Sequence, residues 1–178
     1  MIFAADSAVG DLAATVVLAL RNRSQTVATA ESLTGGLVGA TITTVPGASV
    51  VYRGGLITYA TDLKAELAGV SAAVLASDGP VAPTTAAQLA RGAARTCGAD
   101  WGLATTGVAG PEPQDGHPVG QVFIAVAGPD PEDSSDGFAG ERPVQVREVS
   151  LAGDRAEIRG RTVVAVLRLL IEQLEIPA

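Results

Sequence analysis

Two separate segments of the chain hold residue types that together could perform nucleophilic hydrolysis. Ser32 lies in the segment ESLTGG (31–36), where a short β-branched run gives way to a helical pattern. Lys64 is the only lysine, because the other eleven of the 12 basic residues are arginines. A lysine can lose its proton when it is desolvated, and the neutral amine can then act as the general base for a serine hydroxyl. We therefore consider a serine nucleophile with a lysine base, beside two alternatives: Ser32 only caps a helix, and Lys64 is an ordinary solvated side chain.

Tyr59 and Ser49 are the other hydroxyl-bearing residues of interest near Lys64. Tyr59 precedes Lys64 by five residues across a predicted junction of strand and helix, and Ser49 lies ten residues before Tyr59. A Ser/Tyr/Lys set supplies a nucleophile, a base and a further hydroxyl without a histidine.

Two glycine-containing loops follow predicted strands and could hold an anionic ligand. The first is the segment 31–36, where backbone N–H groups converge at the start of a helix, so that a phosphate could bind there. The second is TTGVAGP (105–111). Because ligands of α/β sheets bind at the carboxyl ends of strands, we expect both loops to face one pocket, although each could be a structural turn alone.

Other chemistry has weaker support in the sequence. His117 is the only histidine and sits in a loop with four glycines and three prolines (107–120), so a histidine-based triad would depend on a mobile residue. The carboxylate pairs Glu112/Asp115 and Glu132/Asp133 lie in polar loops and are expected to aid solubility. Cys97 is the single cysteine, so it forms no disulfide within the chain and no zinc-binding spacing is present.

Alternating strand and helix patterns must position these residues. Asp154, three residues before Glu157, predicts a capping box at the start of the last helix, and the acidic segment 128–140 is expected to be a solvent-exposed excursion. The alternation predicts a layered α/β sandwich. Predicted strands cover 26–30, 52–59, 101–106, 120–127 and 144–151, and predicted helices cover 11–21, 37–43, 62–67, 83–95 and 154–174.

Composition limits the class of protein further. The chain has 178 residues, 47% of them hydrophobic, which suits one globular domain. A net charge of −7 argues against a nucleic-acid partner, because such a surface needs a basic stripe. The longest apolar run, in 162–174, is interrupted by Arg168 and Glu172, so no membrane span is expected. A cytoplasmic location is the simplest expectation.

Six segments together resemble successive blocks of the CinA C-terminal family, the PncC-type nicotinamide-nucleotide amidohydrolases. They occur in the family's order between about Thr26 and Leu170, and only their combination is specific. The segments are TAESLTGG, GGLITYATDLK, DGPVAPTTAAQLARGA, TTGVAGP, HPVGQVFIAVA and GDRAEIRGRTVVAVL.

The resemblance implies a compact three-layer α/β/α sandwich around a central mixed sheet, with residues 1–178 forming one domain. It also implies hydrolysis of the carboxamide of nicotinamide mononucleotide to nicotinic acid mononucleotide and ammonia, with no metal and no cofactor. In longer family members a larger domain precedes this one, so the chain resembles the stand-alone form. We expect a homodimer, because a twofold pair is the commonest closed assembly.

The resemblance also implies roles for individual positions. Ser32 is the first candidate nucleophile and Ser49 the second. Lys64 is the base, and Tyr59 orients or relays the proton. The residues expected to bind the oxyanion, the phosphate or other parts of the substrate are Thr34, Gly35, Gly36, Thr106, Gly107, Gly110, Arg155 and Arg159.

Three features depart from the family pattern. Ala82 stands where many members have serine, His117 where they have lysine, and the loop 112–116 replaces a Gly-Gly-Thr sequence. These departures leave two other hypotheses open: a nucleotide-binding module without turnover, and a scaffold domain that serves a partner protein.

Overall fold

Helices and strands alternate along most of the chain. The computed structural model describes residues 7–130 and 141–175, so residues 131–140 of the predicted solvent-exposed excursion (128–140) lie outside the described residues. The elements in chain order are α1 (Ser7–Asn22), β1 (Val27–Glu31), α2 (Leu37–Thr43), η1 (Ala48–Val50), β2 (Tyr52–Ile57), α3 (Thr61–Ala68), α4 (Ala72–Ser77), α5 (Pro83–Cys97), β3 (Trp101–Gly107), β4 (Gln121–Ala127), β5 (Val144–Ser150) and α6 (Arg155–Gln173).

The strands form one mixed five-stranded sheet in the order β2-β1-β3-β4-β5. Strand β1 pairs in parallel with β2 and β3, whereas β4 is antiparallel to both of its neighbours. The carboxyl ends of β1, β2 and β3 therefore meet at one edge of the sheet. Both glycine-containing loops leave the sheet at this edge.

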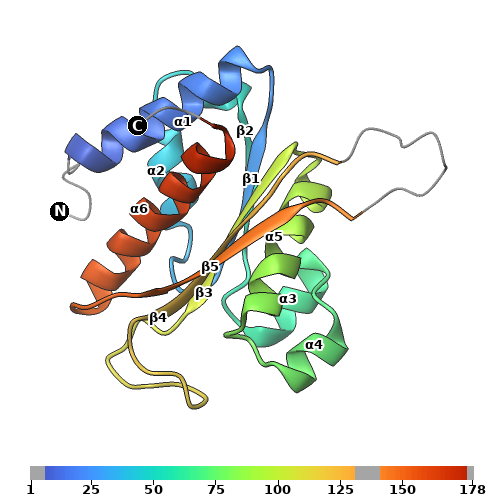
Figure 1. Cartoon of the computed structure of the whole chain (residues 1–178), viewed down its shortest axis with the longest axis vertical. Helices are drawn as coiled ribbons and strands as arrows, with labels where there is room; N and C mark the ends of the chain where they lie inside the picture. The colour runs from blue at the N-terminus through green and yellow to red at the C-terminus, as the bar shows by residue number, and fades with distance from the viewer. Residues whose placement is uncertain (1–6, 131–140, 176–178) are drawn as a thin grey trace.

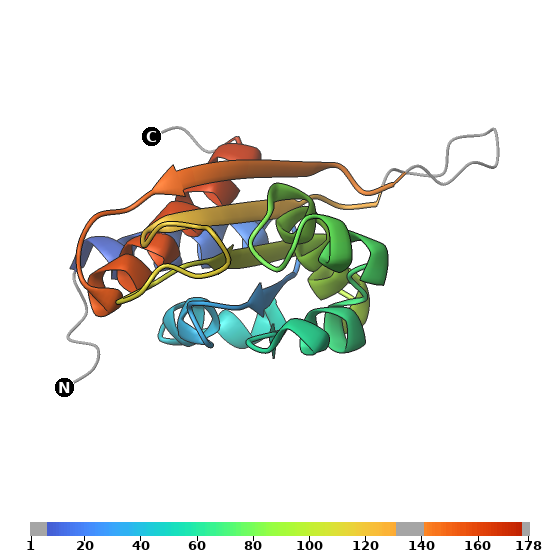
Figure 2. The same cartoon turned by 90° about the horizontal axis from the view of Figure 1, so that it is seen from below.

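Helices cover both faces of the sheet and give three layers (Figures 1 and 2). Helices α1, α2 and α6 pack on one face over a core rich in leucine, valine and isoleucine, which includes Leu103 and Ile124. Helices α3 and α5 pack on the other face over a core made mostly of alanine, which includes Ala28 and Ala104. Successive strand residues point to opposite faces, so each strand supplies both cores. The predicted α/β/α sandwich is confirmed.

Small residues let α5 approach the sheet and α3 closely. A Cβ at Gly102 of β3 would overlap the carbonyl oxygen of Ala90 in α5, and a Cβ at Gly92 of α5 would overlap that of Ala68 in α3. The Ala-rich helix is thus held close to its neighbours by positions where no side chain fits.

The sequence-based boundaries differ from the structure in a few places. Strand β2 ends at Ile57, two residues earlier than predicted, so Thr58 and Tyr59 belong to the loop before α3. The short elements η1 and α4 were not predicted, because three and six residues are too few to show a helical period. The capping box at Asp154 and Glu157 is confirmed.

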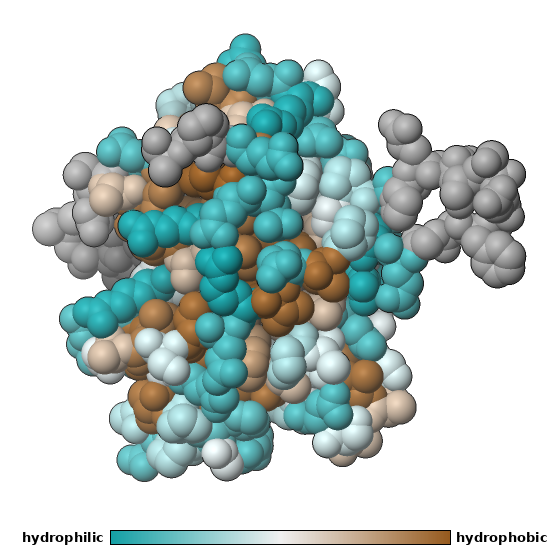
Figure 3. Space-filling view, in the orientation of Figure 1, coloured by the Kyte–Doolittle hydropathy of each residue, from teal (hydrophilic) through white to brown (hydrophobic). Residues whose placement is uncertain are grey.

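The face of the molecule seen in Figure 3 is mostly hydrophilic, with hydrophobic residues in smaller patches between polar ones. Among the described residues, no helix is long and apolar enough to span a bilayer.

Candidate active site

A cavity of about 140 Å³ lies at the edge of the sheet where the parallel strands end. Ser32 and Leu33 line it from the loop after β1, and the segment 106–110 lines it from the end of β3. The expectation that the two glycine-containing loops face one pocket is therefore confirmed. Lys64, Tyr59 and Arg155 also contribute to its wall.

Ser32 and Lys64 meet at the base of this cavity. Lys64 is 1% exposed, and its Nζ lies 3.2 Å from the Ser32 Oγ. The Nζ also donates to the carbonyl oxygen of Thr58 at 2.7 Å, with a longer contact of 3.5 Å to that of Tyr59. When the amine is neutral, these two carbonyls can accept its two N–H groups, so that its lone pair remains for the serine hydroxyl.

Burial changes the protonation of Lys64. Desolvation lowers the pKa of this lysine from 10.5 to about 8, while the nearby Asp62 opposes the shift. By the titration equation, about a tenth of the side chains are then neutral at pH 7, compared with fewer than about one in a thousand for an unperturbed lysine. The solvated-lysine alternative does not describe this residue.

Glu31 is a functional neighbour that the sequence reasoning missed. Its side chain is 1% exposed, and its carboxylate accepts hydrogen bonds from the N–H groups of Gly36, Val38 and Gly39 at 3.0, 3.0 and 2.8 Å. The glutamate thus caps α2 and neutralises the positive end of the helix dipole. A carboxylate directly before Ser32, in a segment where a helix begins, was the signal that could have revealed it.

This cap corrects the expected anion site at Gly35 and Gly36. The Gly36 N–H donates to Glu31, and the Gly35 N–H donates to the Ser32 carbonyl at 3.0 Å. The amides of Gly35 and Gly36 are therefore occupied by the chain itself, and this geometry does not support the phosphate site expected there. Thr34 is also unavailable, because it is fully buried and its hydroxyl pairs with that of Thr105 at 2.7 Å.

The second loop keeps amides that could bind an oxyanion. In the part of the chain that the structure describes, the N–H groups of Ala109 and Gly110 have no hydrogen-bond acceptor, and neither does that of Leu33, the residue after Ser32. All three residues line the cavity. Thr106 lines it too, but its hydroxyl donates to the Pro80 carbonyl at 2.6 Å and so holds the loop before α5.

Arg155, the first residue of α6, joins this helix to two loops at the cavity mouth. One of its N–H groups donates to the Gly110 carbonyl, and another donates to the Tyr59 hydroxyl, both at 2.7 Å. The Tyr59 side chain is 57% exposed. Its phenol therefore points to Arg155 and only its backbone carbonyl faces Lys64, so the expected proton relay through Tyr59 has no support in this geometry.

The guanidinium of Arg159 is used for hydrogen bonds within the protein. Its guanidinium donates to the carbonyls of Leu33 at 3.1 Å and Thr34 at 2.7 Å. It does not line the cavity. The phosphate contact expected of Arg159 is therefore not supported, and this arginine instead holds the loop that carries Ser32.

Ser49 is not near Lys64. It lies exposed in η1, three residues before the start of β2, and β2 runs parallel to β1 with Tyr52 opposite Val27. Ser49 is therefore at the amino end of these strands, whereas Ser32 follows their carboxyl end. The expectation that either serine could face Lys64 is wrong for Ser49.

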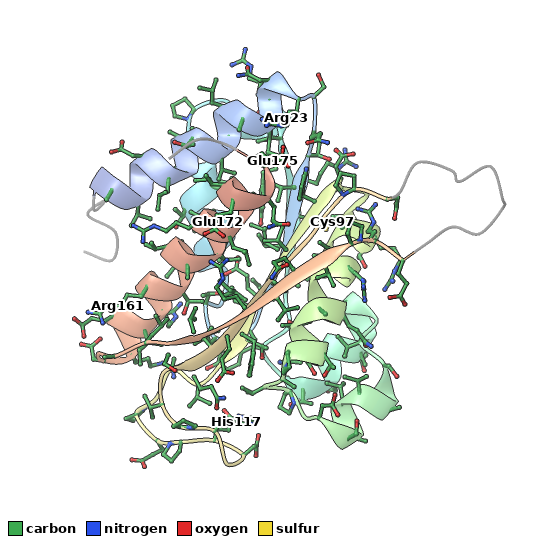
Figure 4. All side chains as sticks on the ribbon, viewed as in Figure 1. Arg23, Cys97, His117, Arg161, Glu172 and Glu175 are labelled. Carbon is green, nitrogen blue, oxygen red and sulfur yellow. The ribbon has the colours of Figure 1, made fainter. Side chains whose placement is uncertain are left out.

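Of the three family departures, Ala82 and His117 lie outside the cavity wall, whereas Glu112 and Gln114 of the loop 112–116 line it. Ala82 is the residue before the first turn of α5 and provides no side-chain cap, so its effect falls on the helix start. His117 lies on the loop between β3 and β4 (Figure 4), where its Nδ1 is 2.9 Å from Gln121 Oε1. Within residues 7–130 and 141–175, no three His, Cys, Asp or Glu side chains converge in a way that could bind a metal.

A protein-family model described as the CinA C-terminal domain matches residues 9–174. A CinA-like protein of Frankia casuarinae is 46% identical over 160 residues, which cover 89% of this chain and 34% of that protein. A putative competence-damage inducible protein of a Geobacillus species is 41% identical over 143 residues, covering 80% of this chain and 32% of its own length. The chain thus spans about a third of the length of these relatives.

Solved structures of similar proteins have the same fold as this chain over almost its whole length. The competence/damage inducible protein CihA of Agrobacterium tumefaciens superposes with a TM-score of 0.84 at 33% identity, covering 98% of this chain and 99% of that one. A competence damage-inducible protein A of Klebsiella pneumoniae gives a TM-score of 0.84 at 28% identity, with coverage of 96% and 99%.

Proposed function

The chain belongs to the CinA C-terminal domain family, and on this basis we propose that it hydrolyses the carboxamide of nicotinamide mononucleotide. The products are nicotinic acid mononucleotide and ammonia. The observation that carries the proposal is the buried contact of 3.2 Å between Lys64 Nζ and Ser32 Oγ in the wall of the cavity. A serine and a desolvated lysine in hydrogen-bond contact are the parts that acyl transfer without histidine needs.

Lys64 transfers one proton when the ester on Ser32 forms and one proton when water hydrolyses that ester. The Ser32 Oγ attacks the carboxamide carbon while its proton moves to the neutral Lys64 Nζ. The Lys64 ammonium then gives this proton to the leaving nitrogen, the C–N bond breaks, and ammonia departs from an ester on Ser32. A water molecule, deprotonated by Lys64, hydrolyses the ester and restores the serine.

Backbone amides would stabilise the oxyanion of this reaction. The N–H groups of Leu33, Ala109 and Gly110 lack an acceptor among the described residues and line the cavity beside Ser32. The amide of the residue after a nucleophile is a common donor in such sites. This arrangement replaces the amides of Gly35 and Gly36, which are already occupied.

The size of the cavity limits which part of the substrate it encloses. At about 140 Å³ it is smaller than the usual range of about 300–1,000 Å³ for ligand pockets, so it fits the pyridine carboxamide and leaves the ribose phosphate at the mouth. Arg155 is the cavity-lining arginine at that mouth and is the phosphate partner we propose. The phosphate would compete with the Tyr59 hydroxyl for one of its N–H groups.

The test is incubation of the purified protein with nicotinamide mononucleotide and measurement of both products. We expect ammonia and nicotinic acid mononucleotide in equal amounts. Binding of the nucleotide without either product would refute the hydrolase and support a nucleotide-binding module instead, which would show as thermal stabilisation by the ligand.

A further inference from the structure

The cavity mouth carries two side chains of opposite charge that do not pair with each other. Arg155 and Glu112 both line the cavity, yet neither forms a salt bridge in the described parts of the chain. Arg155 instead donates to uncharged oxygens, those of Gly110 and Tyr59. The mouth therefore offers one cationic and one anionic position to a ligand.

Glu112 sits on a loop that is fixed on both sides. Arg155 holds the Gly110 carbonyl two residues before it. Gln114 and His117 exchange backbone hydrogen bonds of 3.1 and 2.8 Å two residues after it. Glu112 is solvent-exposed, but hydrogen bonds fix the backbone two residues before it and two residues after it. Its carboxylate is therefore kept close to the cavity.

We propose that Glu112, with the exposed ring of Tyr59, selects substrates whose pyridine nitrogen is substituted and therefore positively charged. This inference rests on the proposed function. A pyridinium carries a delocalised charge that a carboxylate attracts through space and that the face of a phenol ring also favours. With Arg155 on the phosphate and Glu112 near the pyridinium, the two charges of the mouth would match the two charges of the nucleotide. Free nicotinamide, with a neutral ring, would gain nothing from Glu112.

The test compares two ligands that differ by an N-methyl group and by the positive ring charge that it creates. The protein carries Ser32→Ala to prevent turnover, and calorimetric titration measures binding of 1-methylnicotinamide, a cation, and of nicotinamide, which is neutral. We expect the cation to bind more tightly, and Glu112→Gln to weaken its binding about two- to fivefold, as suits an exposed charge contact, with no change for nicotinamide. The preference should shrink as salt is added.

Asp115→Asn provides the matched control. It removes one negative charge from the same loop, does not line the cavity, and keeps a residue that tolerates the positive φ of 51° at this position. We expect this variant to bind both ligands as the parent does. Equal loss of cation binding in both variants, equal affinity of the parent for both ligands, or no binding of the cation would overturn the inference.

This experiment separates the inference from the proposed function, because it measures binding and needs no turnover. If the protein prefers the cation through Glu112 but releases no ammonia from the nucleotide, the pyridinium site is supported and the proposed hydrolase activity is refuted. If the protein releases ammonia but Glu112→Gln has no effect on binding of the cation, the proposed hydrolase activity is supported and the role of Glu112 is refuted.

Discussion

The protonation of Lys64 in the folded protein differs from that of a lysine in water. It is buried beside Ser32, and desolvation lowers its pKa to about 8. A general base works only when it is deprotonated, so activity should increase as pH rises through this pKa and level off above it. We expect kcat/KM for nicotinamide mononucleotide to rise about tenfold per pH unit below 7 and to flatten above 8.5. A profile that is flat from pH 6 to 9, or one that falls, would contradict a lysine base.

Arg155 allows a second prediction at the scale of one residue. If it binds the substrate phosphate, Arg155→Met should raise KM for the nucleotide about tenfold, in line with a charge-assisted contact, and lower kcat much less. Arg168→Met is the control, because Arg168 is an exposed arginine on the same helix and does not line the cavity. Steady-state kinetics of both variants checks this, and similar KM values for the two would refute the phosphate contact.

At the residue scale the sequence indicated Lys64 because it is the only lysine, and Ser32 because it lies in a tight segment between a predicted strand and a predicted helix. It could not separate Ser32 from Ser49, since the parallel pairing of β1 and β2 decides which serine reaches the carboxyl edge. It also could not show that Glu31 takes the amides of α2, because a single carboxylate in a loop motif has no pattern of its own.

The helix α2 depends on this buried carboxylate. Glu31→Gln keeps the size of the side chain but replaces one acceptor oxygen by a donor that faces an N–H group. We expect a loss of about 2 kcal/mol in the free energy of unfolding, since hydrogen bonds to charged groups contribute about 1.5–3 kcal/mol each. Thermal unfolding should show a Tm lower by about 4–8 °C. Glu66→Gln, at an exposed position of α3, should leave Tm unchanged; equal Tm values for both variants would remove the capping role.

The close contact of α5 with α3 gives a second test at the scale of elements. A methyl group at Gly92 would overlap the backbone of Ala68, so Gly92→Ala should destabilise the protein by about 1–3 kcal/mol. Gly160 is the matched control, because a Cβ there has no heavy atom within 4 Å, and Gly160→Ala should gain up to about 1 kcal/mol from helix propensity. Denaturant unfolding of the two variants measures both changes, and a stable Gly92→Ala protein would contradict this packing.

Most elements could be predicted from the sequence because their apolar periods are long. Helix α6 and strand β4 carry buried residues in regular spacing, and both lie close to the predicted bounds. The unpredicted pieces, η1 and α4, are short and are held by neighbours: the α4 helix has no buried residue and packs against α5. Tertiary contacts determine the conformation of such short segments, and the local sequence pattern does not show these contacts.

At the scale of the whole molecule, the cavity is built from segments far apart in the chain. Ser32, Lys64, Gly110 and Arg155 come together because three parallel strands end at one edge and α6 begins beside it. The chain corresponds to about a third of its longer relatives, and every group that the proposed mechanism uses lies within it. The isolated chain should therefore catalyse the reaction alone.

The most direct measurement is ammonia release from nicotinamide mononucleotide by the wild-type chain beside Ser32→Ala, Lys64→Met, Lys64→Arg and Ser49→Ala. We expect the wild type and Ser49→Ala to release ammonia at similar rates. Ser32→Ala and both Lys64 variants should lose at least about a thousandfold in kcat, since a nucleophile and its base act as a unit and an arginine cannot lose its proton. Full activity in Lys64→Met, or loss of activity in Ser49→Ala with activity kept in Ser32→Ala, would contradict the Ser32–Lys64 pair.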